Sequence, residues 1–287
     1  MNQINLFFEL IRINKPIGFM LLFWPCAWGL TIAYNFSDEK ITYLFYLTLF
    51  LIGAILMRSA GCIVNDIADK NFDKRVTRTK NRPIASGKIT VTRGFVYSLI
   101  LCLLAFIVLI QFNFLTIILA LVSMPLAFTY PLMKRYTYWP QLFLGITFNY
   151  GIILGWSSVM DELNIMPFIL YLGAIFWTLG YDTIYGFQDI KDDEIIGLKS
   201  TSIKFKLNPY IFLKLCYSIF LASLVIVGFL LKLNLVYFIF LILSSLQMYY
   251  FQIYKLDINK MDSCLKVFRS NNYLGFTILL GLLLGRI

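Results

Sequence analysis

The chain has 287 residues, of which 60% are hydrophobic, 17% aromatic and only 14% charged, and its mean hydropathy is +0.77. Soluble globular chains average about 45–50% apolar and about 25% charged residues, so this composition excludes an ordinary soluble protein. The formal net charge is +10 and the sequence has no histidine, which removes the commonest general base and the commonest transition-metal ligand.

Apolar stretches long enough to cross a membrane recur along the whole chain. Before the first of them, residues 1–18 carry Glu9, Arg12 and Lys15 among apolar residues and have no small-residue cleavage site, which favours an interfacial helix over a signal peptide. We predict an all-α polytopic membrane protein with about nine transmembrane helices, forming a single domain over residues 1–287. A window of about 19 residues places the spans near residues 17–34, 43–61, 95–112, 114–131, 140–158, 164–181, 210–230, 233–253 and 271–286.

The basic residues concentrate in particular loops between these spans. If the N-terminus is cytoplasmic, only Lys40, Lys232 and Arg286 lie on the other side, and the positive-inside rule favours that orientation. Because the positive charge lies in membrane loops and not on a soluble domain, we expect no nucleic-acid partner. Two long charged loops follow the second and sixth spans, and each opens with carboxylates four residues apart. This weak internal repeat predicts two four-helix halves plus a ninth helix, with both loops meeting at one cytoplasmic site.

The first of these loops, NDIADKNFDKRVTRTKNRP, covers residues 65–83. Asn65, Asp69 and Asp73 recur every four residues, so a continuing helix would place them on one face, and Asp66 adds a neighbouring carboxylate. Like charges at this spacing repel, so cations are needed to hold them together. Oxygen ligands without His or Cys favour Mg²⁺, which commonly binds a few carboxylates together with substrate phosphate oxygens.

The second loop, YDTIYGFQDIKDDEIIGLKSTSIKF, repeats the spacing with Asp189 and Asp193. Two facing acidic clusters are predicted to hold metal ions that clamp a diphosphate. The alternative is that both stretches are solvated loops with Asp residues as helix caps, although two matched clusters favour the metal site. The nearby basic residues are expected to contact phosphate oxygens, with positive-inside anchoring as the competing explanation for the pair after the fourth span. These residues are Arg78, Arg82, Lys199 and the pair Lys134 and Arg135.

The pattern NDxxDxxxD followed by RTxxRP resembles the first signature of the UbiA superfamily of intramembrane aromatic prenyltransferases, and DIKDD matches the second signature, DxxxD. The flanking segments KPIGFMLLFWP, MRSAGCIVND and YPLMKRYTYWPQLFLG look most like the 4-hydroxybenzoate polyprenyltransferases of ubiquinone synthesis. The resemblance implies a nine-helix bundle around a central cavity, capped by two cytoplasmic loops. The family's metal-binding positions fall on Asn65, Asp69, Asp73, Asp189 and Asp193.

The resemblance also implies an activity. A Mg²⁺-bound allylic polyprenyl diphosphate would prenylate 4-hydroxybenzoate within membrane lipid, in a bacterial inner membrane, with the active site facing the cytoplasm and no obligatory protein partner. A sibling enzyme acting on haem, a naphthoate or another aromatic shares the same carboxylate motifs and stays open. A transporter or lipid-binding protein is a further alternative, but its charges should lie in mid-span and not at helix ends.

Three more residues are candidates for the chemistry. Asp182 lies seven residues before Asp189, and on a continuing helix it would share that face and orient the phenol or take a proton. Tyr185 is a candidate to shield an allylic cation, with simple packing as the alternative. Arg58 is a charge inside an apolar span, seven residues before Asn65 and about 10 Å deeper, and is predicted to bind the carboxylate of the aromatic acid. The alternative for Arg58 is a structural residue paired with a buried group.

Overall fold

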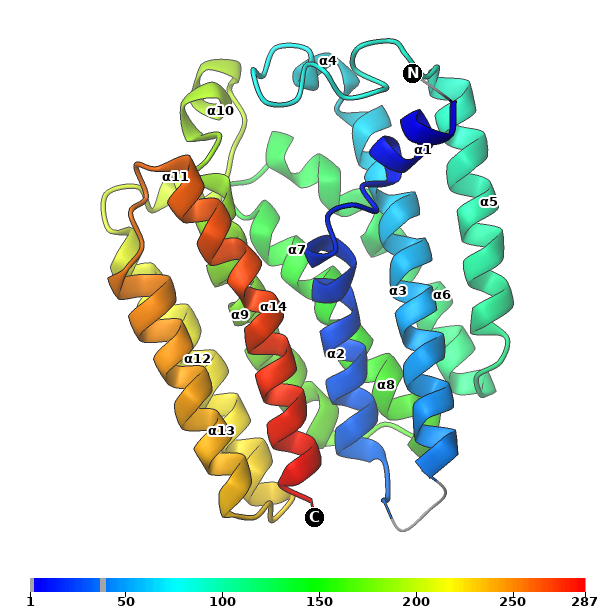
Figure 1. Ribbon diagram of the computed structural model, residues 1–287, viewed down its shortest axis with the longest axis vertical. Coiled ribbons are helices and arrows are strands. Elements are labelled where there is room, and N and C mark those ends of the chain that lie inside the picture. The colour runs from blue at the N-terminus through cyan, green and yellow to red at the C-terminus, as the bar shows by residue number, and fades with distance from the viewer. Residues whose placement is uncertain (1–2, 37–39, 287) are drawn as a thin grey trace.

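The computed structural model describes residues 3–36 and 40–286, and within these residues it contains helices and no strand (Figure 1). Eight helical segments are long and apolar enough to cross a membrane, and a shorter apolar helix of 17 residues completes the bundle, so the predicted count of about nine is confirmed for the described part of the chain. The segments are α2 (Ile17–Ala33), α3 (Lys40–Ala68), α5 (Val91–Leu109), α6 (Phe114–Thr129) with η1 (Tyr130–Arg135), α7 (Pro140–Asn149) with α8 (Gly151–Met160), α9 (Ile165–Gly186), α12 (Pro209–Leu230), α13 (Leu235–Leu246) with the π-helical η2 (Gln247–Tyr254), and α14 (Met261–Leu284).

Two helices extend well beyond their predicted spans. Helix α3 continues to Ala68, whereas hydropathy ends the span near residue 61, and α14 begins at Met261 instead of near residue 271. Both extensions contain polar and charged side chains, which lower the hydropathy average, so it misses them.

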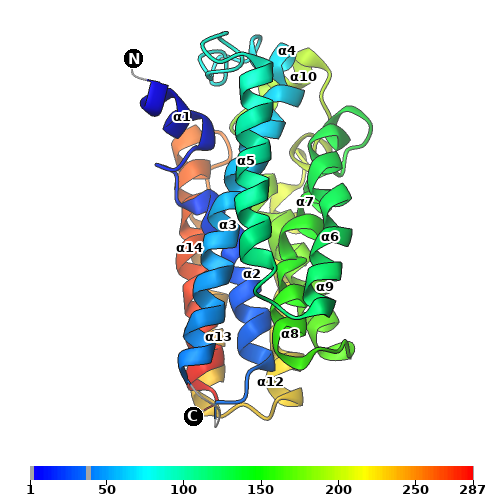
Figure 2. The ribbon, with the colours of Figure 1, turned by 90° about the vertical axis from the view of Figure 1, so that its right-hand side faces the viewer.

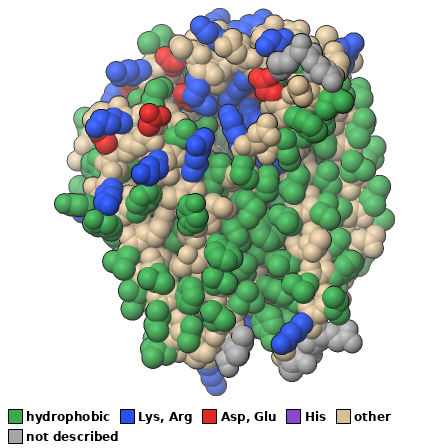
Figure 3. Space-filling model, viewed as in Figure 1, with side chains coloured by type: hydrophobic (Ala, Val, Ile, Leu, Met, Phe, Trp, Pro, Cys, Tyr) green, Lys and Arg blue, Asp and Glu red, His purple; other side chains and the backbone are tan. Residues whose placement is uncertain are grey.

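The short helices gather at one end of the bundle (Figures 1 and 2). They are α1 (Gln3–Ile11), α4 (Lys70–Asp73), α10 (Ile190–Ile196) and α11 (Thr201–Lys204). Lys, Arg, Asp and Glu side chains cluster there, while hydrophobic side chains cover the flank (Figure 3). We call this the charged end. One pocket at the opposite end is lined by Lys40, Lys232 and Arg286, the three basic residues that the sequence placed on the other side of the membrane. The chain is an integral membrane protein whose charges are sorted between its two ends.

The core joins the two groups of helices. Helix α2 packs against α3, α8 and α14, and α9 packs against α7, α12 and α14. Trp28 of α2 and Trp177 of α9 meet with ring centroids 5.0 Å apart. At Gly29 an added Cβ would lie 2.1 Å from the Ile152 carbonyl oxygen, so only glycine permits this approach of α2 to α8. The order of helices is consistent with the predicted two groups of four plus a ninth.

Candidate active site

The first acidic cluster lies where α3 ends at the charged end. Helix α3 stops at Ala68, Asp69 departs from helical geometry (φ −96°, ψ 4°), and one further turn, α4, carries the chain to Asp73. The helix therefore does not continue unbroken through these residues, although an unbroken helix was the condition for placing them on one face. Repulsion among carboxylates on one face opposes a continuous helix, and cations from other segments pair with each of them. Asp66 and Asp69 are each 1% exposed and Asp73 is 6% exposed, so this segment is not a solvated loop.

Each buried carboxylate in this cluster faces at least one cation. Arg82 Nη1 donates to Asp73 Oδ2 at 2.8 Å and lies 3.2 Å from Asp66 Oδ1. Arg12 also pairs with Asp66. Such pairing is required because an unpaired carboxylate in this position would carry a large desolvation cost.

The third carboxylate, Asp69, is paired from the loop after α6. Lys134 Nζ lies 2.5 Å from Asp69 Oδ2, and Arg135 Nη2 lies 3.7 Å from Asp69 Oδ1. Arg135 also donates to the Ala68 carbonyl at 2.6 Å and lies 5.1 Å from the Phe72 ring centroid, so it supports the end of α3. The predicted cations after the fourth span therefore reach the first acidic cluster.

The second cluster is reached by a residue of the first loop. Arg78 Nε donates to Asp189 Oδ1 at 2.8 Å, and Arg78 Nη1 donates to the Tyr185 hydroxyl at 3.1 Å. This contact joins positions 111 residues apart in the sequence. The structure thus brings the two charged loops together, as the internal repeat predicted.

Asp193 differs from the other carboxylates because no described residue forms an ion pair with it. Its partial burial, followed by the negative charge of Asp189, raises the pKa of Asp193 to about 6, while the charge of Lys134 acts in the opposite direction. Lys134 therefore lies between Asp69 of one cluster and Asp193 of the other.

Two predicted site residues have structural contacts of their own. Lys199 donates from Nζ to the Tyr136 carbonyl at 3.2 Å, and its backbone N–H donates to the Lys134 carbonyl at 2.9 Å, so it ties the second loop to η1. The Tyr185 ring lies 4.5 Å from the Phe268 ring centroid, and the Arg78 guanidinium lies 5.5 Å from the Tyr185 ring centroid. The Tyr185 ring therefore packs against Phe268 and also lies near the positive charge of Arg78.

Below the clusters, Arg58 lies in the interior of α3 without a partner. Among the described residues no side chain or carbonyl forms a hydrogen bond or ion pair with it, and its Nε is buried and unsatisfied. Its guanidinium carbon lies 5.7 Å from the Phe148 ring centroid, and a Cβ at Gly18 would lie 2.9 Å from Arg58 Nε. Gly18 of α2 therefore leaves the space that the guanidinium occupies.

Asp182 faces this region from α9. Arg58 is the charged group whose field acts on the Asp182 carboxylate, although the two form no direct ion pair. The helix that would place Asp182 and Asp189 on one face does not continue, because α9 ends at Gly186 and the chain turns before Asp189, the N-cap of α10. Glycine is a poor helix former and commonly lies at such a helix end.

Sequence reasoning missed two contributors. Arg12 was assigned only to the charge bias of the N-terminal segment, yet it adopts a left-handed conformation (φ 56°) after α1 and pairs with Asp66. Nothing in the sequence distinguishes Arg12 from Lys15, since the positive-inside rule explains both. Gly18 was quoted only within the flanking motif, and its role depends on a contact between α2 and α3.

The donor set suits a hard divalent cation. It consists of carboxylates and one amide, Asn65, with no thiol or imidazole. Asp69 Oδ1 is buried without a hydrogen-bond donor, which leaves one acceptor for a ligand. Within residues 3–36 and 40–286, no three metal-binding side chains converge on one point, because the carboxylates turn toward cations. A metal ion must therefore compete with these ion pairs.

Helices long enough to cross a membrane, with interleaved carboxylates and cations at one end above an unpaired interior arginine, define an integral membrane protein with a polar site at one end. The sequence profile of the UbiA prenyltransferase family matches residues 22–278, and the chain belongs to this family.

Similar proteins agree with this assignment. The mitochondrial 4-hydroxybenzoate polyprenyltransferase of Bos taurus is 44% identical over 284 residues, which cover 98% of this chain and 75% of that protein. The 4-hydroxybenzoate octaprenyltransferase of Psychromonas ingrahamii is 41% identical and covers 96% of this chain and 95% of its own length.

Solved structures share the fold at low sequence identity. An apo UbiA homologue from Aeropyrum pernix K1 has a TM-score of 0.77 at 20% identity, covering 93% of this chain and 97% of that one. A UbiA homologue from Archaeoglobus fulgidus, solved with GPP and Mg²⁺, has a TM-score of 0.71 at 17% identity, covering 97% and 99%. These matches confirm the predicted fold class.

Proposed function

We propose that this protein transfers a polyprenyl group from an allylic polyprenyl diphosphate to the ring of 4-hydroxybenzoate, releasing diphosphate, in ubiquinone biosynthesis. Relatives named for 4-hydroxybenzoate prenyl transfer, 40–44% identical over nearly the whole chain, support the substrate class. The structural observation that carries the proposal is Arg58, an unpaired cation below two charged clusters. A carboxylate on the acceptor would satisfy it with a bidentate charge-assisted hydrogen bond.

The acidic residues would hold the divalent ion. When bound there, Mg²⁺ would supply positive charge that stabilises the departing diphosphate. Its proposed ligands come from both loops and are Asn65, Asp66, Asp69, Asp73, Asp189 and Asp193.

The cations now paired with those carboxylates have a second proposed role. Once the carboxylates bind the metal ion, these cations bind phosphate oxygens together with Lys199. The paired cations are Arg78, Arg82, Lys134 and Arg135. They neutralise the leaving group while the bond between its oxygen and the first prenyl carbon breaks. A ring carbon of the acceptor then forms the new C–C bond, and that carbon loses its proton.

Three further residues act on the acceptor and the cation. Arg58 holds the carboxylate and so aims the opposite side of the ring toward the charged end. Asp182, whose carboxylate faces the same region, accepts the phenol or ring proton. Tyr185 offers its ring face to the allylic cation, and the apolar interior keeps water from quenching that cation.

The proposal treats residues 1–287 as one domain in a bacterial inner membrane with the charged end in the cytoplasm. The sorting of basic residues between the two ends supports this orientation. A cysteine introduced at Lys80 should react with a membrane-impermeant thiol reagent only after the cells are opened. Labelling in intact cells would reverse the orientation.

The decisive test is product identification. Membranes containing the protein are incubated with Mg²⁺, a labelled polyprenyl diphosphate and a panel of aromatic acceptors. We expect labelled prenyl-4-hydroxybenzoate, its loss in excess chelator, and about 100-fold less product from membranes carrying the Asp69→Asn variant. Transfer to haem or a naphthoate, but not to 4-hydroxybenzoate, would assign a sibling activity, and no transfer to any acceptor would overturn the proposal.

A further inference from the structure

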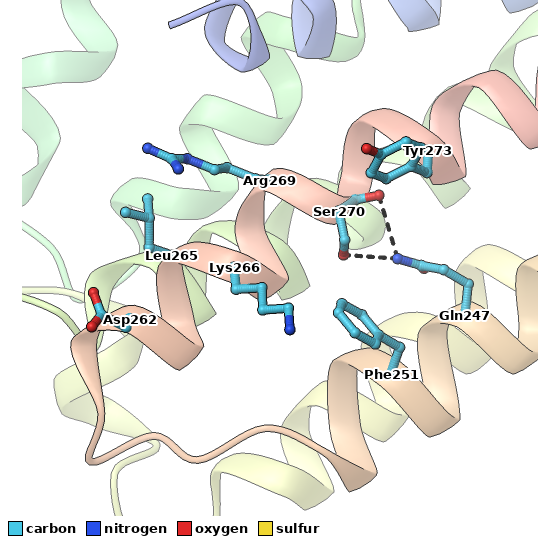
Figure 4. A pocket seen from close by; sticks show the side chains of 8 residues that line it. All are labelled: Gln247, Phe251, Asp262, Leu265, Lys266, Arg269, Ser270 and Tyr273. Atoms are coloured by element: carbon cyan, nitrogen blue, oxygen red, sulfur yellow. Dashed lines mark hydrogen bonds between the residues drawn. The ribbon is translucent and has the colours of Figure 1, made fainter.

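A groove on the outer flank of the bundle lies apart from the charged clusters. It runs between η2 and the first half of α14 and has a volume of about 540 Å³ (Figure 4). While α13 packs closely along α14, η2 makes few contacts with it, so the two helices separate toward the charged end. The lining residues are Gln247, Phe251, Asp262, Leu265, Lys266, Arg269, Ser270 and Tyr273.

The groove combines an apolar wall with uncompensated positive charge. Lys266 points between the helices toward Phe251, with Nζ 5.9 Å from the ring centroid (Figure 4). Arg269 extends from the other edge of α14. Neither forms an ion pair with any described residue, and Asp262, one turn before Lys266, is paired with neither. Two cations against one carboxylate leave the groove net positive.

The two cations lie near the end of α14 that belongs to the charged end. Lys266 and Arg269 follow the first residue of α14 by five and eight positions, which places them about 8 and 12 Å along the helix axis. Long basic side chains near the end of a membrane helix can extend to the level of the phospholipid phosphates, between water and hydrocarbon. Beyond the cations, the exposed ring of Tyr273 continues the same flank toward the middle of the helix. A site with cations at head-group depth and an aromatic surface below is complementary to an anionic lipid.

We propose that this groove binds one anionic phospholipid. Its head-group phosphate lies at Lys266, the positive charge of Arg269 on the other edge of α14 adds to the attraction, and one acyl chain lies along Phe251 and Tyr273. Hydrogen bonds fix the floor of the groove. Gln247 Nε2 donates to Ser270 Oγ at 2.9 Å, and Gln247 Oε1 accepts from Gln252 Nε2 at 2.7 Å.

The bound lipid steadies α14. From the groove floor, Gln252 Nε2 donates to Asn271 Oδ1 at 3.0 Å, and Trp177 Nε1 donates to the same oxygen at 2.8 Å. A ligand that bridges η2 and α14 therefore also stabilises the hydrogen bonds that link Gln252 and Asn271 to Trp177 in the aromatic core. The binding can be measured without any catalytic readout, so it stands or falls separately from the proposed reaction.

The first test counts lipids bound to the purified full chain by native mass spectrometry. Phosphatidylglycerol is titrated against phosphatidylcholine with the same acyl chains, and we expect one phosphatidylglycerol to be retained preferentially. Each basic group near the surface is worth roughly fivefold in affinity, so Lys266→Gln/Arg269→Gln should bind about 25-fold more weakly. The matched control, Lys88→Gln/Arg93→Gln, removes the same charge from exposed positions at the charged end and should bind as the wild type does. Equal losses in both variants would reduce the effect to net charge and overturn the site.

The second test uses the wild-type protein and so does not depend on a variant that folds. A phosphatidylglycerol with a photoreactive head group is incorporated into phosphatidylcholine vesicles with the protein, and the crosslinked peptide is identified. We expect labelling within residues 247–273, competed by phosphatidylglycerol. Labelling elsewhere would overturn the proposal. Competition by inorganic phosphate would show a site for a free anion, and competition by prenyl diphosphate would make the groove a path for the donor, and either result overturns the lipid assignment.

Discussion

The two acidic helix ends have matched spacing in the sequence but different surroundings in the structure. Asn65 and Asp69 at the end of α3 correspond to Asp189 and Asp193 after α9. At the α3 end, the carboxylates are almost fully buried and each faces a cation. At the α9 end, Asp189 has Arg78, and Asp193 has no ion pair with a described residue. The buried carboxylates at the α3 end need cations, because an unpaired buried charge is costly. Asp193 at the α9 end is partly exposed to water and needs no such partner.

The correspondence continues deeper, with opposite charges. Arg58 lies seven residues before Asn65, and Asp182 lies seven residues before Asp189. An internal repeat therefore supplies similar binding groups near the surface and complementary groups in the interior. Arg58 can bind the carboxylate of an anionic acceptor, while Asp182 can accept the proton that the acceptor loses.

The largest expected effect comes from removing one carboxylate from each end. Asp69→Asn and Asp193→Asn should each lower prenyl transfer about 100-fold, because each weakens charge stabilisation worth roughly 3 kcal/mol in the transition state. Only Asp69→Asn should also lower the melting temperature, since it leaves Lys134 and Arg135 without their carboxylate. Glu194→Gln, which breaks an exposed pair, is the control and should change neither quantity. Equal melting temperatures for the two Asp variants would show that the buried α3 end depends on its ion pairs no more than the α9 end does.

The interior contrast is tested at Arg58. Arg58→Ala should raise the apparent KM for 4-hydroxybenzoate roughly 10- to 100-fold, the range of a charge-assisted hydrogen bond, and leave the donor KM unchanged. Arg58→Lys should recover only part of this, because an ammonium lacks the planar fork. A phenol without the carboxylate should lose little further on mutation. If both acceptors lose equally, Arg58 does not contact the carboxylate.

The two cations after α6, Lys134 and Arg135, provide the next test. Lys134→Gln/Arg135→Gln should raise the donor KM about tenfold and leave the acceptor KM unaffected, since charge-assisted contacts to phosphate are lost. Lys88→Gln/Arg93→Gln removes the same charge elsewhere at the charged end and serves as the control. Altered membrane insertion with normal kinetics would instead assign Lys134 and Arg135 to topology.

A smaller effect is expected from Gly18→Ala. The new Cβ would lie 2.9 Å from Arg58 Nε, so the guanidinium must shift. Off-rotamer strain of about 0.5–1.5 kcal/mol corresponds to a roughly 2- to 10-fold rise in the acceptor KM. Gly53→Ala, where a Cβ would meet nothing within 4 Å, should leave this KM unchanged. Identical kinetics for both alanine variants would show that Gly18 does not position Arg58.

The smallest effect concerns stability against pH in metal-free protein. The pKa of Asp193 is raised to about 6 from 3.8, so the folded state binds its proton more tightly than the unfolded state does. This contribution to stability is complete below about pH 4 and is lost as the pH rises through about 6. Melting curves in chelator should therefore show a decline for the wild type over this window that is shallower in Asp193→Asn. A decline of the same size in both proteins would exclude Asp193 as its source.

The sequence predicted the features that depend on local composition. Nine apolar segments, two charged loops and a deep Arg58 follow from hydropathy and spacing alone. The break at Asp69 and the turn after Gly186 were missed, because they depend on cations supplied by distant segments and on where a helix stops. Arg12 was missed for the same reason, since its partner Asp66 lies 54 residues away. An ion pair between residues far apart in the sequence cannot be predicted from the local spacing of either residue.

The contact between α2 and α14 has a consequence for biosynthesis. Trp28 Nε1 donates to the Gly275 carbonyl at 3.0 Å across 247 residues, and Trp24 Nε1 donates to Asn272 Oδ1 at 3.0 Å. At a ribosomal speed of about 5–20 residues per second, α2 waits roughly 10–50 s for this partner to be made. During that interval both indole N–H groups must be satisfied by lipid head groups, water or the insertion machinery. The nascent chain is therefore expected to remain associated with an insertase until α14 emerges.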